Sequence, residues 1–212
     1  MHPELLAKAI CGISSEVTFD DFRFRSGIFS KIVAKNVLEF LTINGIGSFS
    51  SDNIIIFSQT DRMKTAITAL QMGCDIEKIS KALNWKDFES LSSEVLHLLG
   101  YRTDTNVLFT KPRMEIDVIG VNSRFAIVAD CKHWWRTNQS VMSVCAKKQA
   151  ERTKFLIDRK NDIDSAVPII LSLYTMKVQF IGGVPIVPIS RFKAFIDDIQ
   201  AHLQEICVVF AE

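Results

Sequence analysis

The sequence predicts an α/β protein in which a mainly helical N-terminal part precedes a mixed central sheet flanked by helices. Apolar residues recur at helical spacing as far as Leu99, and from Tyr101 onward the pattern changes to the alternation typical of strands. Two further helical segments interrupt and follow the strands, at 141–160 and 191–206. Hydrophobic residues make up 48% of the 212 residues, which is sufficient for a packed core.

Residues 1–60 are predicted to form a small helical unit that ends in a hairpin. The expected helices contain Leu5–Ile10, Phe19–Phe24 and Ile28–Ile43, and two strand-like runs follow between Ile46 and Ser58. Three helices followed by a hairpin is the element order of a winged helix-turn-helix domain. Residues 61–84 then contain two more helical segments, which we interpret as a helical connector.

Residues 85–212 are predicted to form the sheet-containing domain. Asn84 is a suitable N-cap for a helix over Trp85–Leu99, which Gly100 ends. Strands are expected at 113–121, 125–131, 167–173 and 178–181, with the first two joined by a turn at Asn122–Ser123. Ser190 is the expected cap of the last helix.

Composition narrows the functional class. The net charge is only +1, so any nucleic-acid-binding surface must be local. The five cysteines form no CxxC pair, which argues against a zinc site and favours buried free thiols in a reducing compartment. The N-terminus lacks the pattern of an export signal, and the apolar stretch 167–189 is broken by prolines and glycines. We therefore expect a cytoplasmic protein without a membrane span.

The segment Asp130–Cys131–Lys132 carries the strongest chemical signal. Side chains alternate along a strand, so Asp130 and Lys132 share a face while Cys131 points into the core. A turn at Asn122–Ser123 places Asp117 opposite Val128 and Glu115 opposite Asp130. The three acids and the lysine would then project from one face of the hairpin.

Neighbouring carboxylates repel one another unless a cation lies between them, and hard oxygen ligands suit Mg²⁺ or Mn²⁺. Such an ion can bind a phosphate oxygen and lower the pKa of water, while Lys132 can stabilise charge developing on the phosphate. These are the requirements of phosphodiester hydrolysis. The alternative is a solvated hairpin with charged residues on its open face, which is common in antiparallel sheets.

The order of these segments resembles Mrr-type restriction endonucleases and archaeal Holliday-junction resolvases of the PD-(D/E)xK superfamily, over roughly residues 85–200. The similar segments are Phe88–Glu89 through Gly100–Tyr101, then Glu115–Gly120, then Asp130–Trp134. The resemblance implies a restriction-endonuclease-like core with Glu89, Asp117, Asp130 and Lys132 as catalytic residues. It implies a metal held by Asp117, Asp130, Glu89 and the backbone carbonyl of Cys131. Many Mrr-type proteins have Gln at the position of Asp130, and Glu94 competes with Glu89 as the helical acid.

The helix after this hairpin is a candidate nucleic-acid-binding surface. Residues 132–160 contain eight Lys or Arg against two acids, a net charge of +6, which suits contact with phosphates. Gln149 resembles a glutamine found on this helix in several such nucleases. A solvated helix face and a core tryptophan are the other interpretations of this region. The candidate residues are Lys147, Lys148, Gln149, Arg152, Trp134 and Arg136.

The third N-terminal helix offers Lys31 and Lys35 for DNA contact. Residues 1–85 nevertheless contain nine Lys or Arg and nine Asp or Glu, so substrate targeting and protein contact stay equally open. We expect a Mg²⁺-dependent endodeoxyribonuclease acting in restriction, repair or recombination. The alternatives are a non-catalytic DNA-binding protein and an RNA-directed nuclease. Cutting both strands of a duplex usually requires two sites, so the sequence is compatible with a homodimer.

Overall fold

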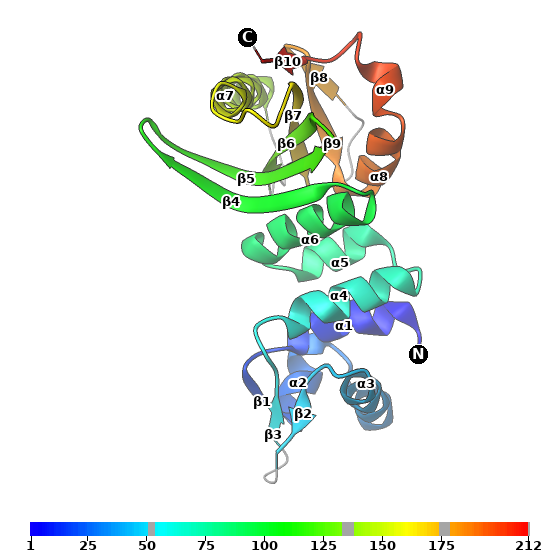
Figure 1. Ribbon diagram of the computed structural model, residues 1–212. Helices are drawn as coiled ribbons and strands as arrows, with labels where there is room; N and C mark the ends of the chain where they lie inside the picture. Colours follow the sequence, from blue (N-terminus) through cyan, green and yellow to red (C-terminus); the bar gives the residue numbers. More distant parts are fainter. Residues whose placement is uncertain (51–53, 133–137, 174–178, 212) are drawn as a thin grey trace. The chain divides into compact units, whose positions relative to one another are not determined.

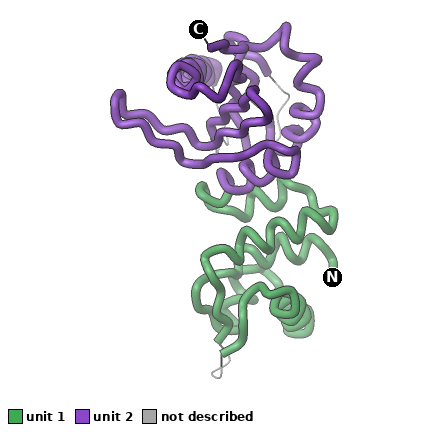
Figure 2. The backbone as a smooth tube through the Cα atoms, viewed as in Figure 1, with its two compact units in different colours: residues 1–87 green, residues 88–212 purple. Residues whose placement is uncertain are grey.

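A computed structural model describes residues 1–50, 54–132, 138–173 and 179–211 of the chain. The backbone divides into two compact units, Met1–Asp87 and Phe88–Glu212 (Figure 2). Both units are mixtures of helices and strands, and each is described separately below.

The first unit combines helices with a small antiparallel sheet. The sheet has the order β1-β3-β2, in which Val17 pairs with Ile55 and Phe49 pairs with the same residue from the other side. The three helices predicted within residues 1–60 are present, and β1 is a strand that the sequence did not predict. The elements are α1 (Pro3–Gly12), β1 (Glu16–Thr18), α2 (Phe19–Ser26), α3 (Lys31–Ile43), β2 (Ser48–Phe49), β3 (Ile54–Ile56), α4 (Asp61–Gln71) and α5 (Ile76–Ala82).

Side-chain caps define the helix starts in this unit. Thr18 accepts the N–H of Asp21 at the start of α2, and Ser30 accepts the N–H of Val33 at the start of α3. The helices α4 and α5, which the sequence predicted as a connector, pack against α1 within this unit.

The second unit is built on a seven-stranded mixed sheet, as the sequence predicted in outline (Figure 1). The strand order is β4-β5-β6-β7-β9-β8, and β10 also pairs with β7. β6, β7 and β9 are parallel to one another, whereas the other pairs are antiparallel. The elements from α6 onward are α6 (Trp85–Leu98), β4 (Arg102–Thr110), β5 (Arg113–Asn122), β6 (Phe125–Lys132), α7 (Gln139–Ile157), β7 (Ser165–Ser172), β8 (Gln179–Ile181), β9 (Val184–Pro188), α8 (Ile189–Asp197), α9 (Ile199–His202) and β10 (Val209–Phe210).

The two faces of strands β5 and β6 are covered by different helices. On one face, Val121 and Val128 form a core cluster with Leu156 and Ile157 of α7. On the other face, Gly120 lies against Leu96 of α6: a Cβ atom at Gly120 would come within 2.9 Å of that side chain. Successive side chains on β6 point to opposite faces of the sheet, so they lie alternately against α7 and against α6.

The buried stripe of α6 differs in part from the one that helical spacing predicts, which consists of Trp85, Phe88, Leu91, Val95 and Leu98. Trp85 and Leu98 are 43% and 65% exposed, and Leu96 is fully buried. The final helix also differs. It begins at Ile189 after Pro188, not after Ser190, and a break at Asp198 separates α8 from α9. The short strands β9 and β10 were not predicted. Two prolines in β9 obscure its strand pattern in the sequence, and β10 is a strand only because it pairs with β7.

Two expectations about composition can be compared with the structure. All five cysteines are free, but only Cys74 and Cys131 are buried, and Cys11 is exposed, so the expectation of buried thiols was wrong for the others. Among the described residues, no helix is both long enough and apolar enough to cross a membrane.

Candidate functional site

The candidate site lies where β5 separates from β6. The two strands pair from Asn122–Phe125 to Val118–Ala129, and beyond that point residues 113–116 of β5 pair only with β4. The turn consists of Ser123 and Arg124, and Ser123 adopts φ +54°. The predicted turn and register were therefore wrong: Val128 faces Ile119, not Asp117. A shift of two residues preserves which side chains share a face, because the period of a strand is two.

Asp117 is the first residue of β5 beyond its last pair with β6, and the β4–β5 register does not include it either. Its Oδ2 atom accepts the backbone N–H of Cys131 at 2.7 Å. This side-chain contact takes the place of the next backbone hydrogen bond between the two strands. The side chain is buried, with 9% of the residue exposed. Burial, and after it the negative charge of Asp130, raises the pKa of Asp117 to about 6. The Cys131 N–H, Lys132 and Arg152 act in the opposite direction on this pKa.

Asp130 lies on β6 and is 3% exposed. Its Oδ2 atom is 2.7 Å from Nζ of Lys132, and its Oδ1 atom accepts a hydrogen bond of 2.8 Å from Nη1 of Arg152 on α7. The structure thus brings together three of the predicted site residues, Asp117, Asp130 and Lys132. It also pairs Asp130 with Arg152, a contact that the sequence did not predict.

Cys131 lies between the carboxylates and α6. Its thiol is fully buried, 3.7 Å from Oγ of Ser92. Burial raises the pKa of this thiol well above its usual value, and Asp117, then Glu89 and Asp130, add to the increase. All three acids therefore lie near Cys131. Their negative charges and the burial of the thiol both disfavour the thiolate form.

Glu89 approaches from the α6 side and is 3% exposed, whereas Glu94 is only half-buried. Of the two candidate helical acids, Glu89 is the one close to the hairpin. Within the described part of the chain, however, no three His, Cys, Asp or Glu side chains form a group that could hold a metal ion. The reason is the geometry of the sheet: the Asp130 side chain points to α7, whereas α6 covers the Cys131 face.

The chemistry of the remaining donors fits Mg²⁺. Two buried carboxylates on adjoining strands are hard oxygen ligands. Mg²⁺ usually keeps several waters and is bound by one or two carboxylates together with phosphates of the substrate. Asp117 and Asp130 would supply that carboxylate pair, and the Cys131 carbonyl remains a predicted ligand.

The nucleic-acid-binding residues predicted between 134 and 152 fall into three groups. Lys147, Lys148 and Arg152 lie on α7, where the two lysines are exposed and Arg152 is half-buried. Gln149 is fully buried, and its Nε2 atom donates to the carbonyl of Val128 at 2.8 Å. Gln149 therefore fixes α7 to β6 instead of facing a ligand. Trp134 and Arg136 lie outside the described residues.

Lys31 and Lys35 lie on α3 of the first unit, and both are exposed. Lys35 pairs with Glu39 at 3.7 Å, one helical turn away. These lysines belong to a different unit from the acidic pair and are considered separately from it.

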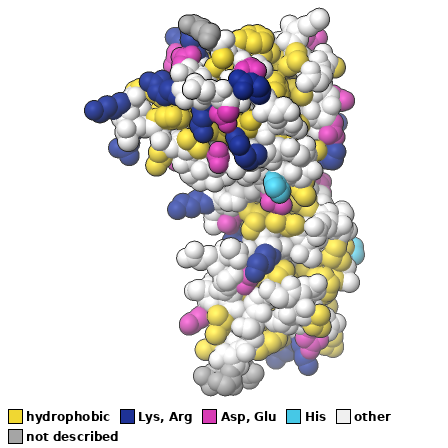
Figure 3. Space-filling view, viewed as in Figure 1, with side chains coloured by type: hydrophobic (Ala, Val, Ile, Leu, Met, Phe, Trp, Pro, Cys, Tyr) yellow, Lys and Arg dark blue, Asp and Glu magenta, His cyan; other side chains and the backbone are white. Residues whose placement is uncertain are grey.

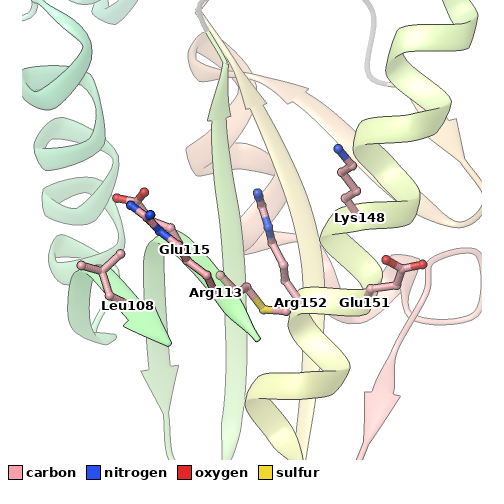
Figure 4. Close-up of a pocket in the computed structure, with 7 residues that line it drawn as sticks. Leu108, Arg113, Glu115, Lys148, Glu151 and Arg152 are labelled. Carbon is pink, nitrogen blue, oxygen red and sulfur yellow. The ribbon is translucent and has the colours of Figure 1, made fainter. Parts of the chain in front are cut away.

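A pocket of about 460 Å³ lies between the β4–β5 hairpin and α7 (Figure 4). Arg113 comes from the hairpin, and Lys148 and Arg152 come from the helix. Basic and acidic side chains are interspersed over this unit in Figure 3. Arg113 was missed by the sequence argument, although the Lys111–Pro112–Arg113 turn of the hairpin was a local basic signal. The lining residues are Leu108, Arg113, Met114, Glu115, Lys148, Glu151 and Arg152.

Comparison with protein-family models and with curated proteins finds no match to this chain. A solved structure similar to it is that of protein VC1899 from Vibrio cholerae, with 12% sequence identity and a TM-score of 0.45. The similarity covers 96% of this chain and 52% of that protein, so the chain spans about half the length of that structure.

Proposed function

We propose that this protein is a Mg²⁺-dependent endodeoxyribonuclease. The observation that carries the proposal is the placement of two buried carboxylates, Asp117 and Asp130, on adjoining strands with Lys132 against Asp130. Burying two like charges side by side is unfavourable, and the raised pKa of Asp117 is a direct consequence. A bound divalent cation would offset that repulsion. Ion binding therefore explains the two buried carboxylates, whereas core packing alone does not require them.

The order of elements supports two finer assignments. A helix followed by an antiparallel β4–β5–β6 meander, then α7 and parallel β7, is the arrangement expected of a restriction-endonuclease-like core. In the first unit, three helices and a small three-stranded sheet match the element order of a winged helix-turn-helix. We propose both assignments on this order and on the sequence resemblance.

Each residue of the site has a separate task in this proposal. Asp117 and Asp130 would hold the ion, which when bound would supply Lewis-acid stabilisation of phosphate charge and make water a better nucleophile. The Cys131 N–H fixes the Asp117 carboxylate through their 2.7 Å hydrogen bond. Lys132 is partly exposed, so its ammonium group can contact a phosphate that enters from solvent.

The test is a cleavage assay on duplex, branched and single-stranded DNA and on RNA, with Mg²⁺, with Mn²⁺ and with chelator. We expect ion-dependent DNA cleavage by the wild type and its loss in Asp117→Asn and Asp130→Asn. Calorimetry with Mg²⁺ should show that the double variant loses ion binding. Cleavage that persists in chelator would overturn the proposal, and cleavage of RNA alone would redirect it to the RNA-directed alternative.

One observation favours the second candidate, a non-catalytic DNA-binding protein. Both oxygens of Asp130 are engaged by cations, and no three acidic or imidazole or thiol groups converge among the described residues. This candidate predicts DNA binding that Asp117→Asn leaves unchanged and no cleavage under any ion condition. The same assay therefore separates the two candidates.

For the N-terminal unit, the surface favours protein contact over DNA contact. Phe24 on α2, Phe29 just before α3 and Ile32 in the first turn of α3 are 80%, 70% and 74% exposed. Exposed large apolar side chains typically mark contact surfaces between proteins where they form a continuous patch. Sedimentation of the wild type and of Ile32→Asp would test whether this surface supports a homodimer.

A further inference from the structure

Arg152 contacts Asp130 of the candidate site and also lines the neighbouring pocket. Its guanidinium binds Oδ1 of Asp130 at 2.8 Å, and the same side chain lines the pocket between the β4–β5 hairpin and α7. Lys132, the other cation on Asp130, does not line that pocket and lies on the same strand as its partner. A ligand in the pocket can therefore reach Arg152 directly.

The pocket has the chemistry of a phosphate subsite. Arg113 reaches it from one side, and Lys148 and Arg152 reach it from the other. Two acids, Glu115 and Glu151, also line it, so its net charge is +1. In Figure 4 the cationic ends of Lys148 and Arg152 point in the same direction from α7, whereas the carboxylate of Glu151 points away from them. A phosphate between these cations would meet donors from two different elements.

We propose that Arg152 is a positioning residue that holds Asp130 until a nucleic-acid phosphate enters this pocket. The phosphate then competes with Asp130 for the guanidinium and frees Oδ1 for the divalent ion. Phosphate binding and ion binding are thereby cooperative, and the free protein binds the ion weakly. This inference rests on the proposed metal-dependent nuclease function.

The physical reason is competition for one oxygen. The Arg152 guanidinium, 2.8 Å from Oδ1, engages an oxygen that a metal ion would need and repels a second positive charge. Arg152 is a suitable residue for exchange because its side chain is partly exposed at 28%, whereas Asp130 is 4% exposed. Arginine forms bidentate contacts with phosphate as readily as with carboxylate.

The decisive experiment measures Ca²⁺ affinity by calorimetry on the full chain, with and without a short blunt-ended DNA duplex. Ca²⁺ uses the same oxygen ligands, and a gel run afterwards shows that the duplex is intact. In the wild type, the duplex should increase Ca²⁺ affinity by about 5- to 150-fold, the usual range of coupling between two sites. In Arg152→Gln without DNA, Ca²⁺ should bind more tightly than to the wild type, and the effect of the duplex should shrink accordingly.

Control variants separate a specific exchange from the loss of one positive charge. Lys154→Gln removes an exposed lysine of α7 that does not line the pocket, and it should leave Ca²⁺ affinity without DNA close to that of the wild type. Lys148→Gln should weaken duplex binding without tightening Ca²⁺ binding. Arg152→Lys keeps the charge and should give an intermediate Ca²⁺ affinity, which preserves the test where Arg152→Gln is poorly folded.

The outcomes distinguish this inference from the proposed function. Suppose that the wild type cleaves DNA with Mg²⁺, but Arg152→Gln and Arg152→Lys bind Ca²⁺ no more tightly than the wild type does. That result would overturn the proposed role of Arg152 and leave the nuclease proposal in place. Absence of Ca²⁺ and Mg²⁺ binding in the wild type, even with the duplex, would overturn the nuclease proposal and this inference together.

Discussion

The carboxylate of Asp117 accepts the backbone N–H of Cys131 at 2.7 Å, at the point where β5 stops pairing with β6. This contact keeps a negative side chain buried beside a second one, Asp130. Burial, and after it the charge of Asp130, raises the pKa of Asp117 to about 6.

This raised pKa makes stability depend on pH. The folded protein binds the Asp117 proton more tightly than the unfolded chain does, since the usual value is 3.8. The stabilisation is complete below the unfolded pKa and is lost as the pH rises through the folded pKa. Between about pH 7 and about pH 5, the wild type should gain about 1 kcal/mol of unfolding free energy relative to Asp117→Asn.

Urea denaturation of both proteins at the two pH values, in chelator, measures this difference. Added Mg²⁺ should reduce the gain, because a bound cation keeps the carboxylate ionised. Identical pH dependence in the two proteins would show that Asp117 titrates as an exposed aspartate does.

Lys132 should matter for catalysis and little for folding. Its ammonium group is partly exposed, and Arg152 still pairs with Asp130 when the lysine is removed, so Lys132→Met should change the melting temperature only slightly. Cleavage should fall by about 100-fold or more, the usual loss when one group that stabilises transition-state charge is removed. Calorimetry should show that Mg²⁺ binding survives. Loss of ion binding together with cleavage would assign Lys132 a structural role instead.

Gln149 should matter for folding. It is fully buried, and its amide donates to the Val128 carbonyl at 2.8 Å. Gln149→Ala leaves that carbonyl without its donor and opens a cavity, so the free energy of unfolding should fall by about 2–3 kcal/mol. The exposed neighbour Lys147 is the matched control, and Lys147→Ala should remain within about 0.5 kcal/mol of the wild type. Equal stability of the two variants would contradict the anchoring role.

Gly120 allows α6 to lie close to β5. A Cβ atom there would lie 2.9 Å from Cδ1 of Leu96 and 3.3 Å from Cβ of Tyr101. Gly120→Ala should therefore lower the free energy of unfolding by about 1–2 kcal/mol, the cost of a modest overpacking. Thermal unfolding followed by circular dichroism measures the change. A melting temperature at or above that of the wild type would mean that Leu96 moves aside without cost.

The sequence by itself determined which chemistry-bearing residues share a strand face. Alternation placed Asp130 and Lys132 together and Cys131 in the core, and a register error of two residues did not alter this result, since the period of a strand is two. The helical spacing likewise located α6 and α7, because amphipathic periodicity is a local property of the chain.

Contacts between elements were decided only by the tertiary structure. The pairing of Arg152 with Asp130, the burial of Gln149 and the pocket beside Arg113 each depend on how α7 lies on the sheet. A lysine, an arginine and a glutamine on one helix look equally solvent-facing in sequence, because their side chains are long and polar. Which of them faces the sheet depends on the rotation of the helix, and packing against Val121 and Val128 sets that rotation.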